Sequence, residues 1–243
     1  MRLDTYLFDK GYFESRAKAQ DAIKEGLVSV DQKTVTKSSF AIEEGQEVSV
    51  IQVDRYVSRA GDKLDGCIIK DQIDLKDKVV VDIGSSTGGF TDCCLQHGAR
   101  KVYCIDVGTN QLAAKLRQDP RVVVRENTNA RYLKKADFDE EITFICMDVS
   151  FISCTYLFPV ISDLLKNGEH AVILVKPQFE VGSKYLNKQG VVKDPKVREK
   201  ALQEIISLLS TFKLVKCSCM LSNVIGRSGN QEYLLHVVKQ EEL

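Results

Sequence analysis

The stretch Val79-Val-Val-Asp-Ile-Gly-Ser-Ser-Thr-Gly-Gly-Phe90 organises the rest of this chain. Its three valines predict a buried strand, residues 84–89 a glycine-rich turn, and residues 91–97 a helix. Glycine lets the backbone approach a ligand closely, and the first turn of a helix presents free N–H groups. This order of parts favours a site for a nucleotide-like ligand over a strand-to-helix turn without a ligand.

The spacing of the glycines indicates which ligand. Two serines follow Gly84, so the Gly-x-Gly-x-x-Gly of dinucleotide sites is absent, as is the Lys-Ser/Thr pair of a P-loop. Asp-x-Gly-x-x-x-Gly-Gly-Phe is instead typical of sites for S-adenosylmethionine, which we expect as the cofactor. Asp106 ends a second predicted strand about twenty residues beyond the loop, where a carboxylate accepts hydrogen bonds from ribose hydroxyls. The expected cofactor-binding residues are Asp82, Gly84, Ser85, Ser86, Gly88, Gly89, Phe90, Asp106, Val107 and Asn127.

Past the loop, predicted strands alternate with predicted helices. The pattern predicts strands at 102–106, 122–125, 142–148 and 170–176 and helices at 110–118, 156–166 and 197–212. A helix at 60–73 precedes the first strand, and strands at 213–221 and 232–239 close the chain. This alternation predicts an α/β fold with a Rossmann-like methyltransferase sheet, mostly parallel with one antiparallel edge strand.

Residues 1–53 differ from the rest and predict a small α+β domain. Helices at 2–8 and 16–25, the second with Ser15 as its N-cap, are followed by strands at 27–30, 35–36 and 47–53. Residues 54–59 predict a linker, and residues 60–243 predict the larger α/β domain.

Composition narrows the class of protein. The 243 residues are 44% hydrophobic and 28% charged with a formal net charge of zero, which is ordinary for a globular protein. The chain begins with charged residues and has no apolar run long enough to span a bilayer. None of its eight cysteines forms a Cys-x-x-Cys pair. We expect a cytoplasmic monomer with reduced thiols, no bound metal and no membrane partner.

Polar residues stand at several predicted strand ends, where open α/β sheets bind their ligands. Lys176 follows an apolar run, and a lysine there needs a carboxylate partner or solvent. Asp148 ends the neighbouring predicted strand, so we expect it to pair with Lys176, in a reaction site or as a structural ion pair. Glu232 enters the last strand at the same edge. The three histidines, His97, His170 and His236, are expected to have no catalytic role.

The N-terminal residues resemble a known RNA-binding domain. Arg2-Leu-Asp-x-x-Leu, Ser15-Arg-x-x-Ala, Lys24-Glu-Gly-Leu-Val and Lys33-x-Val-x-Lys are similar to the domain found in ribosomal protein S4 and in pseudouridine synthases. Asp31-Gln32 departs from the Asn-Gly usual in its turn. The resemblance implies RNA contact through Arg2, Arg16, Lys18 and Lys24. Because residues 1–50 hold seven basic and nine acidic side chains, a protein-binding module is the alternative.

Five motifs in the same order resemble the TlyA family, which joins an S4-type domain to a methyltransferase of the FtsJ/RrmJ group. They are Ser58-Arg-Ala-Gly-x-Lys-Leu64, Asp82-Ile-Gly-Ser-Ser-Thr-Gly-Gly-Phe-Thr91, Met147-Asp-Val-Ser-Phe-Ile-Ser153, Leu174-Val-Lys-Pro-Gln-Phe-Glu180 and Gly229-Asn-Gln-Glu-Tyr233. The resemblance implies methyl transfer from S-adenosylmethionine to a ribose 2′-hydroxyl of ribosomal RNA, with cytidine as the target. It carries the group's catalytic tetrad onto Lys63, Asp148, Lys176 and Glu232.

Methyl transfer from a sulfonium to a hydroxyl is an in-line displacement, so the protein mainly positions the reactants and helps to remove a proton. We expect Lys176 to be the base and Asp148 to orient it. Lys63 and Glu232 would align the ribose. A carboxylate partner favours a charged lysine, whereas the cationic sulfonium favours a neutral one. Lys176 could instead be a cation that stabilises the forming alkoxide.

Residues 182–200 carry six basic and two acidic side chains. They form either a solvated loop and helix start or a flap that contacts RNA through Lys184, Lys188 and Lys193. Two other functions remain to be weighed. One is an RNA- or ribosome-binding protein with a vestigial cofactor site, against which the intact tetrad argues. The other is a membrane-active haemolysin, against which the absence of a signal peptide and of a cationic amphipathic helix argues.

Overall fold

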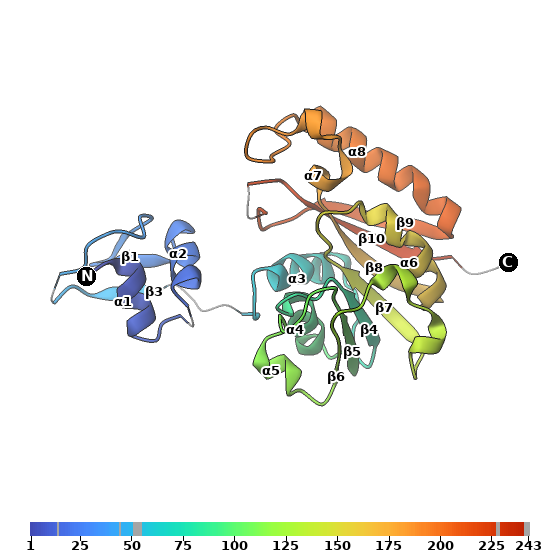
Figure 1. Ribbon diagram of the computed structural model, residues 1–243, viewed down its shortest axis with the longest axis horizontal. Coiled ribbons are helices and arrows are strands. Elements are labelled where there is room, and N and C mark those ends of the chain that lie inside the picture. Colours follow the sequence, from blue (N-terminus) through green and yellow to red (C-terminus); the bar gives the residue numbers. More distant parts are fainter. Residues whose placement is uncertain (14, 44, 51–54, 227–228, 241–243) are drawn as a thin grey trace. The chain divides into compact units, whose positions relative to one another are not determined.

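The computed structural model describes residues 1–243 except 14, 44, 51–54, 227–228 and 241–243. The chain forms two compact units, Met1–Asp54 and Arg55–Leu243 (Figure 1). None of the helices in the described part of the chain has the length and apolar content needed to cross a lipid bilayer.

The N-terminal unit packs two helices against a small antiparallel sheet. Its elements are α1 (Leu3–Asp9), α2 (Arg16–Lys24), β1 (Val28–Val30), β2 (Lys33–Thr34) and β3 (Val48–Val50), with strand order β2-β1-β3. Leu3, Leu7 and Ile23 are fully buried and hold both helices on the sheet. The predicted N-cap is confirmed, because the Ser15 side chain accepts a hydrogen bond from the Lys18 backbone N–H.

The hairpin of this unit differs from the prediction. The strand expected at 35–36 lies at Lys33–Thr34, because Asp31 and Gln32 alone make the turn and Val30 pairs with Lys33. Both turn residues have positive φ, 48° and 64°, as a two-residue type I′ turn requires, although neither is glycine. Of the strand predicted at 47–53, β3 accounts for Val48–Val50, and residues 51–53 lie outside the described part.

The larger unit is built on a seven-stranded sheet (Figure 1). The strands are β4 (Val79–Ile83), β5 (Lys101–Ile105), β6 (Val122–Arg125), β7 (Ile142–Met147), β8 (Leu165–Val175), β9 (Leu214–Leu221) and β10 (Tyr233–Lys239), in the order β6-β5-β4-β7-β8-β10-β9. Strands β4 to β8 run parallel, and β10 is antiparallel to both its neighbours. The predicted fold class is therefore confirmed.

One detail of that prediction is wrong, because the antiparallel strand is not at the edge. Strand β10 is buried along nearly its whole length and lies between β8 and β9, whereas β9 is largely exposed and forms the edge. An apolar strand buries both faces best in the interior of a sheet, so the order of the last two strands follows from their burial.

Helices cover both faces of the sheet. Helices α3 (Ala60–Asp71), α4 (Gly89–Gln96) and α5 (Ala114–Arg117) pack on one face, where Val80 and Val102 point. Helices α6 (Phe158–Leu164) and α8 (Pro195–Leu208) pack on the other, where Val81 and Ile83 point. The short helix α7 (Pro177–Glu180) follows β8 directly. Alternating residues of one strand thus serve two cores, as in a doubly wound sheet.

Several predicted helices and strands have different bounds. The helix expected at 110–118 is only Ala114–Arg117, because the backbone N–H groups of residues 110–112 donate to the Glu126 carboxylate and Asn110 has a φ of 57°. The helix expected at 156–166 becomes a 3₁₀ turn, Cys154–Leu157, and α6, since β8 already begins at Leu165, where it pairs with Ile142. The helix expected at 197–212 begins at Pro195 and ends in a 3₁₀ turn, Leu209–Phe212.

Candidate active site

A cavity of about 580 Å³ opens at the carboxyl ends of the parallel strands in the larger unit. Its walls come from the glycine loop, the start of α3, the segments after β7 and β8, and the approach to β10. Of the predicted site residues, the cavity brings together Lys63, Gly84, Ser85, Ser86, Gly89, Phe90, Asp148, Lys176 and Glu232. Residues separated by up to 169 positions in the chain therefore share one site.

The glycine loop has no room for side chains at two positions of this wall. A Cβ on Gly84, which has a φ of 83°, would collide with the Asp148 carbonyl oxygen. A Cβ on Gly89 would collide with the Ser58 hydroxyl. Gly88, with a φ of 95°, instead faces Leu112 and Leu116, away from the cavity lining. This glycine cradle, the loop with Gly84 and Gly89, therefore packs directly against the Asp148 backbone and Ser58, which also line the cavity.

Asp82 lies beneath the loop and does not line the cavity. It is fully buried, and one carboxylate oxygen accepts a hydrogen bond from the Thr91 hydroxyl at 2.7 Å. Its other oxygen has no hydrogen-bond partner among the described residues. Burial raises the pKa of Asp82 to about 7, and the nearby Asp148 carboxylate adds to the rise. The hydrogen bond from Thr91 therefore links Asp82 to the first turn of α4, behind the loop.

Three predicted cofactor residues lie next to the loop but outside the cavity lining. The Asp106 carboxylate accepts hydrogen bonds from the backbone N–H groups of Ser86 at 2.8 Å and Gly108 at 2.7 Å. Val107 is 70% exposed, and the Asn127 backbone N–H donates to the Gly108 carbonyl at 3.0 Å. Asp106 therefore holds the loop through Ser86, while contact of these three residues with the cofactor stays a prediction.

Two ion pairs face the cavity. The Lys176 ammonium lies 2.5 Å from the Asp148 carboxylate and also donates to the Ser150 hydroxyl at 2.8 Å. The Lys63 ammonium lies 2.6 Å from the Glu232 carboxylate. The four side chains come from α3, the ends of β7 and β8, and the residue before β10, and each is less than one-fifth exposed. Because a buried charge is costly alone, each partner holds the other in place.

Sequence reasoning did not assign a role to several residues of this cavity. Phe151 is 88% exposed and has a φ of 66°. Its ring centroid lies 5.2 Å from that of Phe179. Glu180 fixes the same segment by accepting from the Ser153 hydroxyl at 2.6 Å and the Cys154 N–H at 2.8 Å. The Val-Ser-Phe-Ile-Ser run directly after Asp148 was the available signal, because it places an aromatic ring shortly after a strand end.

The basic segment between α7 and α8 forms part of the cavity wall. Leu186, Gln189 and Gly190 line it, and Lys184, Lys188 and Lys193 are exposed. The Asn230 side chain holds the segment, accepting from the Val192 N–H and donating to the Gly190 carbonyl, both at 3.0 Å. This placement favours a flap beside the site over a remote solvated loop.

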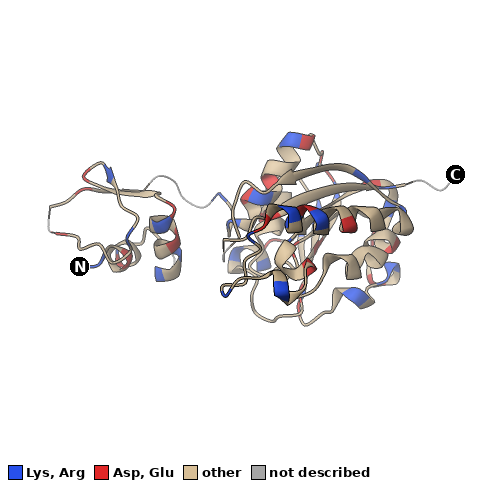
Figure 2. Ribbon diagram, turned by 90° about the horizontal axis from the view of Figure 1, so that it is seen from above, with Lys and Arg blue, Asp and Glu red and all other residues tan. Residues whose placement is uncertain are grey.

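In the N-terminal unit the predicted RNA-binding arginines share one buried carboxylate. Asp4 is fully buried and accepts from Arg2 at 2.9 and 3.0 Å, from Arg16 at 3.2 Å and from Gln20 at 2.6 Å. These hydrogen bonds hold the pKa of Asp4 well below its usual range. Both guanidinium groups remain about half exposed, and Lys18 and Lys24 lie on α2 with Arg16. Basic and acidic residues are interspersed along the ribbons of both units (Figure 2).

Comparisons with known proteins identify the families to which the two units are similar. Residues 56–239 match the model of the FtsJ-like methyltransferase family, and residues 1–48 match that of the S4 domain. Hemolysin A of Brachyspira hyodysenteriae is 45% identical over 239 residues, covering 98% of this chain and 100% of that protein. The 16S/23S rRNA (cytidine-2′-O)-methyltransferase TlyA of Mycobacterium tuberculosis is 35% identical, covering 99% of this chain and 91% of that protein. A solved structure of a candidate hemolysin from Streptococcus thermophilus is 37% identical with a TM-score of 0.79, covering 100% of this chain and 89% of that one.

Proposed function

The chain belongs to the TlyA family, in which an S4 domain precedes an FtsJ-like methyltransferase domain, and from this we propose that it methylates the ribose 2′-hydroxyl of cytidine in ribosomal RNA. The methyl donor is S-adenosylmethionine. The observation that carries the proposal is the Lys176–Asp148 ion pair of 2.5 Å, in the same cavity as the glycine loop.

The residues present fit this cofactor. Gly84 and Gly89 of the glycine cradle line the cavity with backbone alone, and Ser85 and Ser86 add hydroxyl groups to the same wall. Phe90 supplies an apolar surface in the lining. When bound, the cofactor supplies an electrophilic methyl group on a cationic sulfur. Asp106 would accept from the ribose hydroxyls of its nucleoside half.

The two ion pairs divide the work on the RNA ribose. Lys176 would take the proton of the 2′-hydroxyl in its neutral form, which a nearby cationic sulfonium favours, and Asp148 would orient Lys176. Lys63 and Glu232 align the ribose, because they face the same cavity from α3 and the approach to β10. Positioning of the oxygen in line with the bond between sulfur and the methyl group is the main contribution of the protein.

RNA is held by two groups of basic residues in this proposal. Arg2 and Arg16, oriented by Asp4, together with Lys18 and Lys24, contact the phosphate backbone through the N-terminal unit. Lys184, Lys188 and Lys193 contact RNA beside the cavity. Since ribosomal RNA is the substrate, we place the protein in the cytoplasm. The cavity is lined by residues of a single chain, so we propose that the protein acts as a monomer.

Methyl transfer from labelled S-adenosylmethionine to ribosomal subunits tests the proposal. Subunits from a strain lacking this protein should accept label from the wild-type chain and not from Lys176→Ala, while both chains bind S-adenosylmethionine equally. Failure of the wild-type chain to label either subunit or free ribosomal RNA would contradict it.

Two alternatives predict other outcomes. An RNA- or ribosome-binding protein with a vestigial cofactor site would bind subunits without measurable affinity for S-adenosylmethionine. A membrane-active protein, the alternative raised by the name of the Brachyspira hyodysenteriae relative, would release dye from liposomes at concentrations that support methyl transfer.

A further inference from the structure

A second cluster of reactive side chains lies apart from the cavity, on the three strands at one side of the sheet. His170 is on β8, His236 on β10 and Cys217 on β9, and one possible metal-ligand atom from each lies within 4.8 Å of the other two. The strands are neighbours in the order β8-β10-β9. None of the three residues lines the cavity that holds Lys176 and Asp148.

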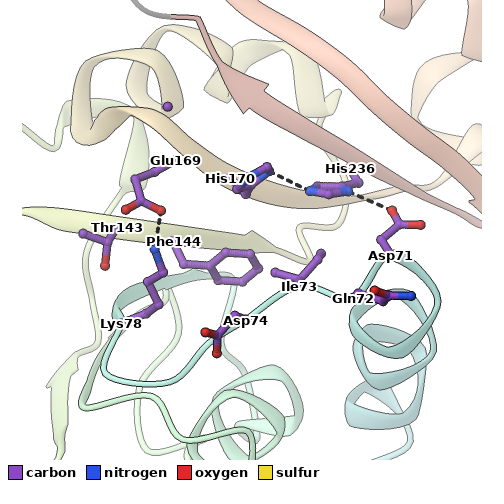
Figure 3. Close-up of a pocket in the computed structure, with 11 residues that line it drawn as sticks. Asp71, Gln72, Ile73, Asp74, Lys78, Thr143, Phe144, Glu169, His170 and His236 are labelled. Atoms are coloured by element: carbon purple, nitrogen blue, oxygen red, sulfur yellow. Dashed lines mark hydrogen bonds and ion pairs between the residues drawn. The ribbon is translucent and has the colours of Figure 1, made fainter.

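A carboxylate from the helix layer that covers this face of the sheet orients the two histidines. The Asp71 carboxylate, at the end of α3, lies 2.7 Å from His236 Nδ1, and His236 Nε2 lies 2.9 Å from His170 Nδ1 (Figure 3). The Ser218 hydroxyl also donates to Asp71. An N–H at Nδ1 that donates to Asp71 leaves the lone pair of His236 Nε2 pointing toward His170. Metal-binding histidines are typically oriented by such a carboxylate.

A β-bulge brings the cysteine to this face. His236 pairs with Ser218 and Val237 with Lys216, so Cys217 has no partner in the ladder. In a regular strand Cys217 would point away from the face to which Ser218 points, and a bulge re-aims such a side chain. Cys217 is exposed whereas His236 is buried, so the cluster is open to solvent on the cysteine side.

We propose that His170, His236 and Cys217 bind a divalent transition-metal ion, zinc being the best match, with Asp71 as the carboxylate that orients His236. Two imidazoles and a thiolate suit zinc, whereas magnesium and calcium require oxygen ligands. This revises the sequence-based expectation of a protein without a metal. Binding releases the thiol proton and moves the ring proton of His170 from the metal-facing nitrogen to the other.

The two histidine nitrogens lie close to the spacing of a zinc site. With zinc–nitrogen bonds of about 2.0–2.1 Å and a tetrahedral angle, two ligand nitrogens lie about 3.3 Å apart. The two histidine nitrogens are 2.9 Å apart, so a widening of about 0.4 Å brings them to this spacing, and the Cys217 sulfur lies within 4.8 Å of both ligand atoms. The ion would join β8, β9 and β10 to each other and, through Asp71, to α3. A fourth position, on the exposed side, would be filled by water.

Another cluster, Asp65, Cys93 and His97, is a poorer candidate. Asp65 already pairs with Arg55 at 2.6 Å and with His97 at 2.7 Å, and Cys93 is fully buried. A cation there would have to compete with the Arg55 guanidinium. A substitution of His97, in this second cluster, therefore serves as a control in the metal-binding experiment.

Cobalt(II) and zinc(II) titrations of the full chain, freed of metal and kept reduced by a phosphine, test the proposal. Cobalt should bind with one equivalent and give a sulfur-to-cobalt charge-transfer band, and zinc should displace it. Cys217→Ser should remove the band, and Asp71→Asn should weaken zinc binding by about 10–100-fold. Two controls, Cys219→Ser on the same strand and His97→Asn, should leave the band and the affinity unchanged.

Three results would overturn the proposal. These are no stoichiometric cobalt binding by a chain with native circular dichroism, a charge-transfer band that survives Cys217→Ser, and loss of binding in His97→Asn. His170→Ala and His236→Ala should each abolish binding, and their circular dichroism must match the wild type for the result to count. The exposed Cys217→Ser variant keeps the test valid if a buried histidine variant fails to fold.

Discussion

Helix α3 and strand β10 are joined at two places, and the two places differ in chemistry. Near the start of both elements, Lys63 pairs with Glu232 at 2.6 Å and faces a cavity with a glycine cradle. Further along, Asp71 pairs with His236 at 2.7 Å and faces a second histidine and a cysteine. The first join lies at the edge where parallel strands bind ligands, and the second does not. In our proposals, similar contacts between the same two elements serve methyl transfer in one place and metal binding in the other.

The largest expected effect distinguishes the two roles open to Lys176. Lys176→Arg keeps the positive charge beside Asp148 but cannot accept a proton, so single-turnover methyl transfer should fall by about 10²–10⁴-fold. The affinity for S-adenosylmethionine, measured by calorimetry, should not change. A rate within about tenfold of wild type would instead mean that Lys176 acts as a stabilising cation.

The Lys63–Glu232 contact and the Asp71–His236 contact should respond differently to matched substitutions. Glu232→Gln leaves Lys63 without its charged partner and misplaces the ribose, which should lower the single-turnover rate by about 10²-fold. Asp71→Asn, on the same pair of elements, should leave that rate unchanged and affect metal binding only. Equal losses of methyl transfer in the two variants would show that the joins are not separate in function.

The glycine cradle can be tested for stability and ligand binding together. Gly84→Ala forces a Cβ against the Asp148 carbonyl at a φ of 83°, so unfolding by urea should be easier by about 1–3 kcal/mol and S-adenosylmethionine binding should be lost. Gly182→Ala is the control, because its Cβ would meet nothing within 4 Å and its φ is negative. Equal effects in both variants would mean that the cradle has no special shape.

The buried Asp82 gives a pH dependence. Its folded-state pKa is about 7, above the value near 4 of an unfolded aspartate, so the folded state binds the proton more tightly. Stability should therefore fall as the pH rises from about 4 to about 7. Asp82→Asn, whose amide oxygen can still accept from Thr91, should remove this slope from the free energies of urea unfolding measured between about pH 4 and 7. An unchanged slope would contradict burial as its cause.

The smallest expected effect concerns the N-terminal unit. Arg16→Ala removes one of the two guanidinium groups held by Asp4, so the slope of log affinity for ribosomal RNA against log salt should become shallower by about one. Lys166→Ala is the control, because Lys166 pairs with Glu141 in the larger unit. No change in slope for Arg16→Ala would argue that this face does not contact phosphate.

Local patterns predicted the loop, most of the strands, and Asp148, Lys176 and Glu232 at strand ends, whereas the family resemblance alone implied Lys63. The glycine spacing and the polar residues at strand ends are short-range signals, and the structure brings Asp148, Lys176 and Glu232 together with Lys63 of α3 in one cavity. What sequence reasoning missed depends on contacts between distant residues. The Glu126 carboxylate accepts hydrogen bonds from backbone N–H groups at residue 110 and beyond, where the sequence predicted the start of a helix. A bulge in β9 leaves Cys217 without a partner in the ladder.

The most direct test of the central claim is the identity of the methylated nucleoside. Ribosomal RNA methylated by the purified chain should be digested to nucleosides and analysed by mass spectrometry against standards. We predict 2′-O-methylcytidine, formed by the wild-type chain and absent with Lys176→Ala. A methyl group on the base, on another nucleoside, or still present with Lys176→Ala would contradict the assignment of this cavity to ribose methylation.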